Sequence, residues 1–166
     1  RRSHGIALAA VTSASLVFAG ASAHADVKIC QALEQRYEQI ERGATTLEVN
    51  AMLFSAAEKG CEPLAKKLLN AGASLEARDG RGFNPLARAA KSGQKEIVAL
   101  FLDRGAQIDA RSLEGATALY EAAETGRLPI VRELVDRGAN IGLAGRSGIT
   151  PLAAAAYMGS EAIVEL

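Results

Sequence analysis

Residues 148–156 read Gly148-Ile149-Thr150-Pro151-Leu152-Ala153-Ala154-Ala155-Ala156, and this stretch decides the fold because its pattern returns along the chain. Related segments begin at residues 82 and 115, so the step between them is 33 residues. Glycines and paired alanines follow the same step: Gly60, Gly93, Gly126 and Gly159; Gly72, Gly105 and Gly138; Ala56-Ala57, Ala89-Ala90, Ala122-Ala123 and Ala155-Ala156. A fixed period of this length is the signature of a repeat architecture.

Each period predicts two helices. Asn84-Pro85, Thr117-Ala118 and Thr150-Pro151 place an N-cap residue before a first helix, in two cases with proline at its first position. The following glycine, such as Gly93, supplies the left-handed residue that ends this helix. A second helix is indicated by apolar residues at helical spacing, as in residues 97–102. The polar segments between periods, such as residues 106–115, are expected to form hairpin-like connections.

These residues closely resemble the ankyrin repeat, whose pattern runs from Gly-x-Thr-Pro-Leu-His-x-Ala-Ala through Gly-His and Ile-Val to Leu-Leu and Gly-Ala. Residues 148–156, Gly126 with Ile130-Val131, and residues 136–140 carry the resemblance. It covers residues 47–166 as four units, at about 47–78, 79–111, 112–144 and a truncated 145–166. The resemblance implies an all-α solenoid of helix-turn-helix units with hairpin-like loops. The histidine of the family pattern is replaced by Phe54, Ala87, Tyr120 and Ala153.

The ends of the chain differ from the repeats. Residues 1–25 begin with Arg1-Arg2, continue through an apolar run and end in Ala23-His24-Ala25, which is typical of a secretory signal peptide cleaved between Ala25 and Asp26. The apolar run is about 14 residues, whereas a membrane span needs roughly 20, so a permanent anchor is disfavoured. At the other end Leu166 falls inside an expected second helix, so we expect the natural chain to continue.

Residues 26–46 are expected to form an N-terminal capping helix and its linker. Cys30, Leu33, Tyr37 and Ile40 lie at steps of three and four, which predicts one apolar helix face over residues 26–42. Repeat arrays need such an end unit to cover the first core face. Cys30 and Cys61 are the only two cysteines, and in an exported protein they form either a disulfide or two separate thiols. Their spacing matches neither a redox motif nor a zinc site.

Composition excludes several functions. With 19 Lys+Arg against 19 Asp+Glu, the chain is not a strongly basic nucleic-acid binder. Both histidines, His4 and His24, lie in the expected signal peptide, so the mature chain has no histidine base or ligand. The carboxylates Glu121 and Glu124 are read as a solvated helix face, not as a catalytic pair. We therefore expect no catalytic residues, no metal and no cofactor.

The resemblance implies that a partner binds the hairpin tips and the exposed side of the first helices, which together line a concave surface. The matching columns give these candidate partner-binding residues: Arg81, Phe83, Arg88, Lys91, Leu113, Glu114, Glu121, Glu124, Arg146, Ile149, Tyr157 and Met158. Of these, Phe83, Tyr157 and Met158 are expected to be apolar anchors, with packing of Phe83 onto the adjacent hairpin tip as the alternative for that residue.

Charges in these columns alternate from repeat to repeat. Arg81, Arg88 and Lys91 align with Glu114, Glu121 and Glu124 one period later. Two interpretations remain open. The stripes either form a groove that docks a partner of complementary charge, or they form exposed ion pairs between neighbouring repeats that contribute little.

The expected function is a non-catalytic protein-binding scaffold of an exported, bacterial type, acting in the periplasm or after secretion. It would be an accessory or inhibitor of an envelope or secreted enzyme, monomeric, without nucleic acid and without stable membrane insertion. One alternative is a small-molecule or glycan-responsive accessory protein that uses the same concavity. A second is the non-catalytic part of a larger enzyme.

Overall fold

The computed structural model describes the backbone of residues 14–166 and the side chains of residues 26–166. The proposed signal peptide, with its cleavage site between Ala25 and Asp26, therefore lies mostly outside the described residues. Among the helices that are described, none has both the length and the apolar character needed to cross a membrane.

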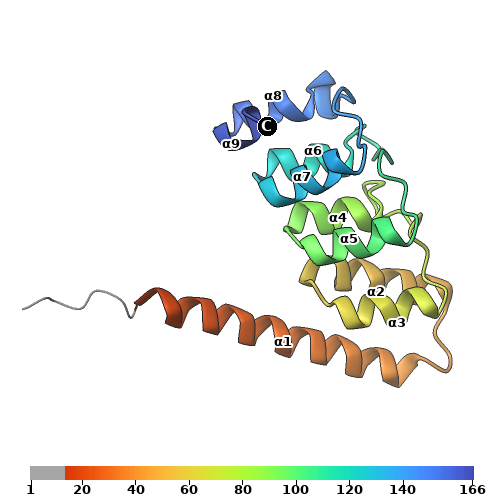
Figure 1. Ribbon diagram of the computed structural model, residues 1–166. Coiled ribbons are helices and arrows are strands. Elements are labelled where there is room, and N and C mark those ends of the chain that lie inside the picture. The colour runs from red at the N-terminus through yellow and green to blue at the C-terminus, as the bar shows by residue number, and fades with distance from the viewer. Residues whose placement is uncertain (1–13) are drawn as a thin grey trace, which may run out of the picture.

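Every regular element within residues 14–166 is helical. The elements, in chain order, are α1 (Ala14–Ile40), α2 (Thr46–Lys59), α3 (Glu62–Asn70), α4 (Pro85–Ser92), α5 (Lys95–Asp103), α6 (Ala118–Glu124), α7 (Leu128–Asp136), the 3-10 turn η1 (Arg146–Gly148), α8 (Pro151–Tyr157) and α9 (Glu161–Val164). Figure 1 shows the helix pairs stacked one upon another, with the connecting loops gathered along one side. The predicted all-α solenoid is confirmed.

The first helices begin and end where the sequence predicts. The side chains of Asn84, Thr117 and Thr150 accept hydrogen bonds from the backbone N–H groups at the N3 positions of α4, α6 and α8. Gly93 closes α4 in the left-handed conformation, with φ of 85°. These caps satisfy backbone donors and carbonyls that a helix leaves free at its ends.

The predicted hairpin-like connections are tight turns, each closed by a backbone hydrogen bond between its first and its last residue. Asp79 donates its N–H to the Phe83 carbonyl at 3.0 Å, Ser112 to Ala116 at 2.9 Å and Gly145 to Ile149 at 2.8 Å. These three turns, residues 79–83, 112–116 and 145–149, are called the tips below. The three tips lie directly before α4, α6 and α8, so they project on the same side of the stack.

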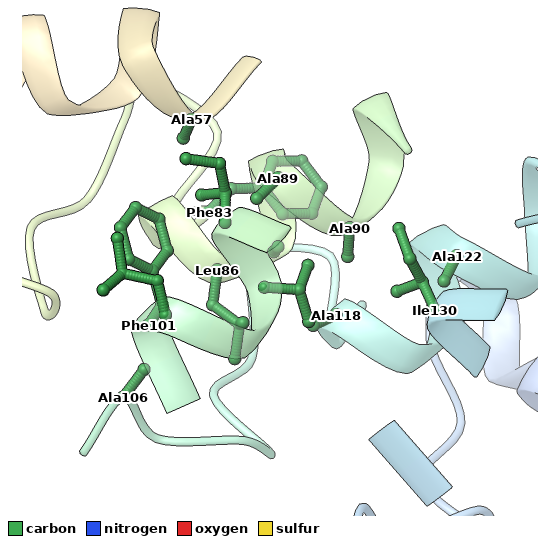
Figure 2. Close-up of a cluster of buried hydrophobic side chains, with 14 of the residues drawn as sticks. Ala57, Phe83, Leu86, Ala89, Ala90, Phe101, Ala106, Ala118, Ala122 and Ile130 are labelled. Carbon is green, nitrogen blue, oxygen red and sulfur yellow. The ribbon is translucent and has the colours of Figure 1, made fainter. Parts of the chain in front are cut away.

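Alanines allow the first helices to pack closely. Helices α2, α4, α6 and α8 contact one another in series, and α3, α5, α7 and α9 form a second series. Ala57, Ala89, Ala90 and Ala122 lie between the larger side chains of the core, as Figure 2 shows. Such small residues bring helix backbones together while the larger apolar residues fill the space around them.

Side chains also tie each repeat to the next. Gln94 donates to the Glu58 carbonyl at 3.1 Å and Arg127 to the Lys91 carbonyl at 3.3 Å. Arg111 donates to the Ala144 carbonyl at 2.8 Å, which joins the second of the tips to the third. These bonds satisfy exposed carbonyls at helix ends and loops.

The predicted capping helix is present within α1, which extends further toward the N-terminus than residue 26. Tyr37 is buried, and Cys30, Leu33 and Ile40 pack against the core. Cys30 and Cys61 form a disulfide, which is the first of the two alternatives for these residues. The disulfide joins α1 to the turn between α2 and α3.

Candidate partner-binding face

The tips and the first helices α2, α4, α6 and α8 form one continuous side of the stack, which we call the inner face. All the candidate partner-binding residues lie on these elements or directly after them. The structure separates them into three groups: a stacked tip, a buried ion-pair network and a set of exposed apolar residues.

Asp79 organises the first tip. One carboxylate oxygen accepts hydrogen bonds from the backbone N–H groups of Arg81 at 2.8 Å and Phe83 at 3.0 Å. The other oxygen lies 2.6 Å from Nε of Arg88, and Glu58 lies 3.5 Å from the same guanidinium. A single aspartate therefore shapes the turn and positions a cation on α4.

The expectation that Phe83 is an exposed apolar anchor is wrong. Its side chain is 2% exposed and belongs to the hydrophobic core, as Figure 2 shows. The guanidinium carbons of Arg81 and Arg88 lie 5.6 Å and 5.8 Å from its ring centroid. Because an aromatic face attracts cations, the ring is a platform for these two arginines and not a contact surface for a partner.

The interpretation of Glu121 as part of a solvated helix face is also wrong. Glu121 is fully buried, at 0% exposure. Its carboxylate lies 2.8 Å from Lys91 Nζ and 3.0 Å from Arg146 Nη2. Since a buried carboxylate is costly unless it is paired, the two cations explain why it is tolerated there.

Arg146 extends this network to two more carboxylates. It lies 2.6 Å from Glu114 and 3.5 Å from Glu124. Burial disfavours the charge of Arg146, but the three surrounding carboxylates outweigh burial and raise its pKa. The third tip is thus joined to both the second tip and α6.

Tyr120 borders the network. Its hydroxyl donates to Glu124 at 3.4 Å. Burial raises the pKa of Tyr120, and the nearby charge of Glu124 raises it further, while Arg146 has the opposite effect. The phenol therefore stays a hydrogen-bond donor at neutral pH.

The alternating charges pair with each other between neighbouring repeats, which agrees with the second interpretation of the stripes. Arg88 pairs back to Glu58, Lys91 forward to Glu121, and Arg146 back to Glu114. The expected ion pairs were exposed ones, whereas the pairs that involve Glu121 contain a buried carboxylate. Most of the inner-face charge is consequently neutralised within the chain.

Four candidate residues remain exposed and apolar. Leu113 is 81% exposed on the second tip, and Ile149 is 41% exposed on the third. Tyr157 ends α8 at 89% exposure, and Met158 follows it at 58%. Two charged candidates are also exposed, Arg81 and Glu114, and the Glu114 carboxylate is paired with Arg146. Arg81 and the four apolar residues, unlike Phe83 and Glu121, are accessible to a partner.

Two residues that position the tips, Asp79 and Arg111, were missed from the sequence. Asp79 holds the turn of the first tip, and Arg111, directly before the second tip, donates to the Ala144 carbonyl directly before the third. The role of Asp79 could have been recognised from the polar residue that begins each of the first two tips. The Ser112 hydroxyl accepts a hydrogen bond from the Ala116 N–H at 3.1 Å, just as the Asp79 carboxylate accepts one from the Phe83 N–H. No cluster of metal-ligating side chains occurs in the part of the chain that the structure describes.

A family model described as ankyrin repeats (3 copies) matches the chain in three overlapping segments, residues 18–112, 53–144 and 107–166. The matches together span most of the chain, including all the first and second helices and the three tips. No curated protein matches the sequence.

Proposed function

Because the chain belongs to the ankyrin-repeat family, we propose that it is an exported, non-catalytic module that binds a partner protein through exposed apolar residues of its inner face. Ankyrin repeats are in general protein–protein interaction modules, and their proteins are typically non-catalytic scaffolds. The partner in this proposal is an envelope or secreted enzyme for which the chain is an accessory or inhibitor. The signal-peptide pattern of residues 1–25 supports a bacterial, periplasmic or secreted location.

The observation that carries the proposal is the exposure of four apolar residues along the inner face, Leu113 and Ile149 on the tips and Tyr157 and Met158 at the end of α8. Tyr157 occupies the same period position as Lys91 and Glu124, whose side chains are occupied by ion pairs. At this repeat the position instead presents an aromatic ring that is 89% exposed. Tyrosine is enriched among residues that dominate binding energy, and methionine adapts to varied partner surfaces.

The paired charges support the same conclusion. A partner cannot use Glu121, which is buried, and it would have to displace Glu58 and Asp79 to reach Arg88. Apolar contact at Leu113, Ile149, Tyr157 and Met158 needs no such displacement. The monomeric scaffold in this proposal therefore recognises an apolar patch on its partner.

Affinity capture from an envelope extract tests the proposal. We expect the wild-type protein to retain one partner, identified by mass spectrometry, and a Tyr157→Ala, Met158→Ala variant to bind the purified partner at least tenfold more weakly in calorimetry, since a hot-spot residue contributes about 2 kcal/mol or more. The matched control is Ile141→Ala, which removes an apolar side chain of 65% exposure outside the tips and first helices. Equal affinities of the double variant and the control would contradict the proposal.

A further inference from the structure

Arg81 differs from the other candidate cations of the inner face because no carboxylate neutralises it. Arg88, Lys91 and Arg146 each lie within ion-pair distance of at least one carboxylate. Among the described residues, the Arg81 guanidinium has neither an ion pair nor a hydrogen bond, and its side chain is exposed. The positive charge of Arg81 is therefore available to a partner.

The fold nevertheless holds Arg81 in place. Its backbone N–H is bound by Asp79, and its guanidinium lies over the Phe83 ring. Stacking on the face of a guanidinium leaves the N–H groups at its edge free to donate. Because the ring beneath is buried, Arg81 loses less conformational freedom on binding than an unsupported surface arginine.

An exposed leucine lies beside this arginine. Leu113 donates its N–H to the Arg81 carbonyl at 3.1 Å, so the two residues are neighbours on adjacent tips. Leu113 also covers Gly82, where an added Cβ would lie 2.8 Å from Leu113 Cγ. The leucine is thus fixed over the tip while its side chain stays 81% exposed.

We infer that Arg81 and Leu113 together form a docking point for a partner segment that carries an aspartate or glutamate next to an apolar side chain. The guanidinium edge can donate two parallel hydrogen bonds to a carboxylate, and Leu113 provides the apolar contact beside it. Two further arginines add positive charge near these residues, which favours an acidic partner. Arg78, which pairs with Glu76, donates to the Gly82 carbonyl at 3.3 Å, and Arg111 donates to the Gly115 and Ala144 carbonyls. The inference rests on the proposed function and specifies the chemistry of the partner.

A phage-displayed library of random dodecapeptides, selected on the oxidised protein, tests the inference. We expect enriched peptides to contain Asp or Glu adjacent to Leu, Ile or Phe. Synthetic copies of these peptides should bind about tenfold more weakly to Arg81→Gln and to Leu113→Ser, as measured by fluorescence polarisation. Arg132→Gln, which removes an exposed arginine from α7, is the matched control and should leave binding unchanged.

Charge reversal separates recognition from an effect on folding. A peptide whose acidic residue is replaced by lysine should bind Arg81→Glu better than it binds the wild type, provided that circular dichroism shows equal melting temperatures. Selected peptides without acidic residues, no enrichment at all, or equal losses in Arg81→Gln and Arg132→Gln would overturn the inference. Displacement of the peptides by oligothymidylate at equal concentration would also overturn it, since the site would then recognise phosphate.

The two proposals fail in different ways. If Arg81→Gln keeps full peptide affinity while the Tyr157→Ala, Met158→Ala variant loses the partner, only the inference is overturned. If the double variant keeps the partner while Arg81→Gln loses the peptides, the Tyr157–Met158 surface is rejected and the Arg81–Leu113 docking point remains.

Discussion

Glu121 links three consecutive repeats of the inner face through ion pairs. Its buried carboxylate receives one cation from the preceding repeat and one from the following repeat. We expect Glu121→Ala to lower the free energy of unfolding by about 3 kcal/mol, because removal leaves Lys91 without its carboxylate and takes from Arg146 its one fully buried partner, while Glu114 and Glu124 remain beside it. The loss lies at the low end for buried pairs because Lys91 and Arg146 are 31% and 30% exposed and reach water. Urea unfolding followed by circular dichroism measures it.

Glu62→Ala provides the control. This glutamate pairs with Lys66 on the surface of α3, and its removal should cost less than about 1 kcal/mol. A Glu121→Ala variant no less stable than Glu62→Ala would show that the network does not hold the repeats together.

At this scale the sequence predicted the candidate site only in part. Phe83, Ala116 and Ile149 share one period position, and all three are apolar. A column that is apolar in these three repeats is typical of a core position, but the expectation of an anchor rested only on the place of Phe83 at a hairpin tip; the structure buries Phe83 and Ala116. The burial of Glu121 could not be predicted because it depends on Arg146, which is 25 residues away and reaches it only after the third tip has folded.

At the scale of elements, the attachment of α1 depends on one covalent bond and few buried side chains. Tyr37 is the only buried residue among the α1 side chains that the structure describes. We expect a Cys30→Ala, Cys61→Ala variant to lose up to about 3–4 kcal/mol of stability, because the bond closes a loop with a sequence separation of 31. Hydrogen exchange should increase first in the amides of α1. An unchanged denaturation midpoint with unchanged α1 exchange would contradict this.

The helices themselves were largely predictable because their end signals are local. Asn84, Thr117 and Thr150 cap the helices that follow them, and each signal is complete within four residues. The bonds between repeats were not predictable in the same way. Arg111 donates to a carbonyl 33 residues further along the chain. The resemblance implies that the repeats stack, but it does not specify which side chains form hydrogen bonds between them.

Across the whole molecule, side chains at equivalent positions of different repeats contribute differently to the free energy of unfolding, because neighbouring elements bury them to different extents. Leu86 and Leu152 occupy the same place in their repeats, but Leu86 is 0% exposed and Leu152 is 53% exposed beside an apolar hollow of about 200 Å³. We expect Leu86→Ala to cost about 3 kcal/mol and Leu152→Ala less than about 1 kcal/mol. Equal shifts of the urea midpoints would show that burial does not distinguish the two positions.

In the exported protein that we propose, the disulfide at the start of the array also bears on the order of folding after export. Its two sulfurs belong to residues 30 and 61, so the bond can form as soon as the chain up to α3 has reached the oxidising compartment. Each later helix pair then packs against the unit before it, and the contacts on its other side form when the following unit folds. The disulfide-bonded N-terminal unit therefore favours folding that proceeds from the N-terminus of the array toward its C-terminus.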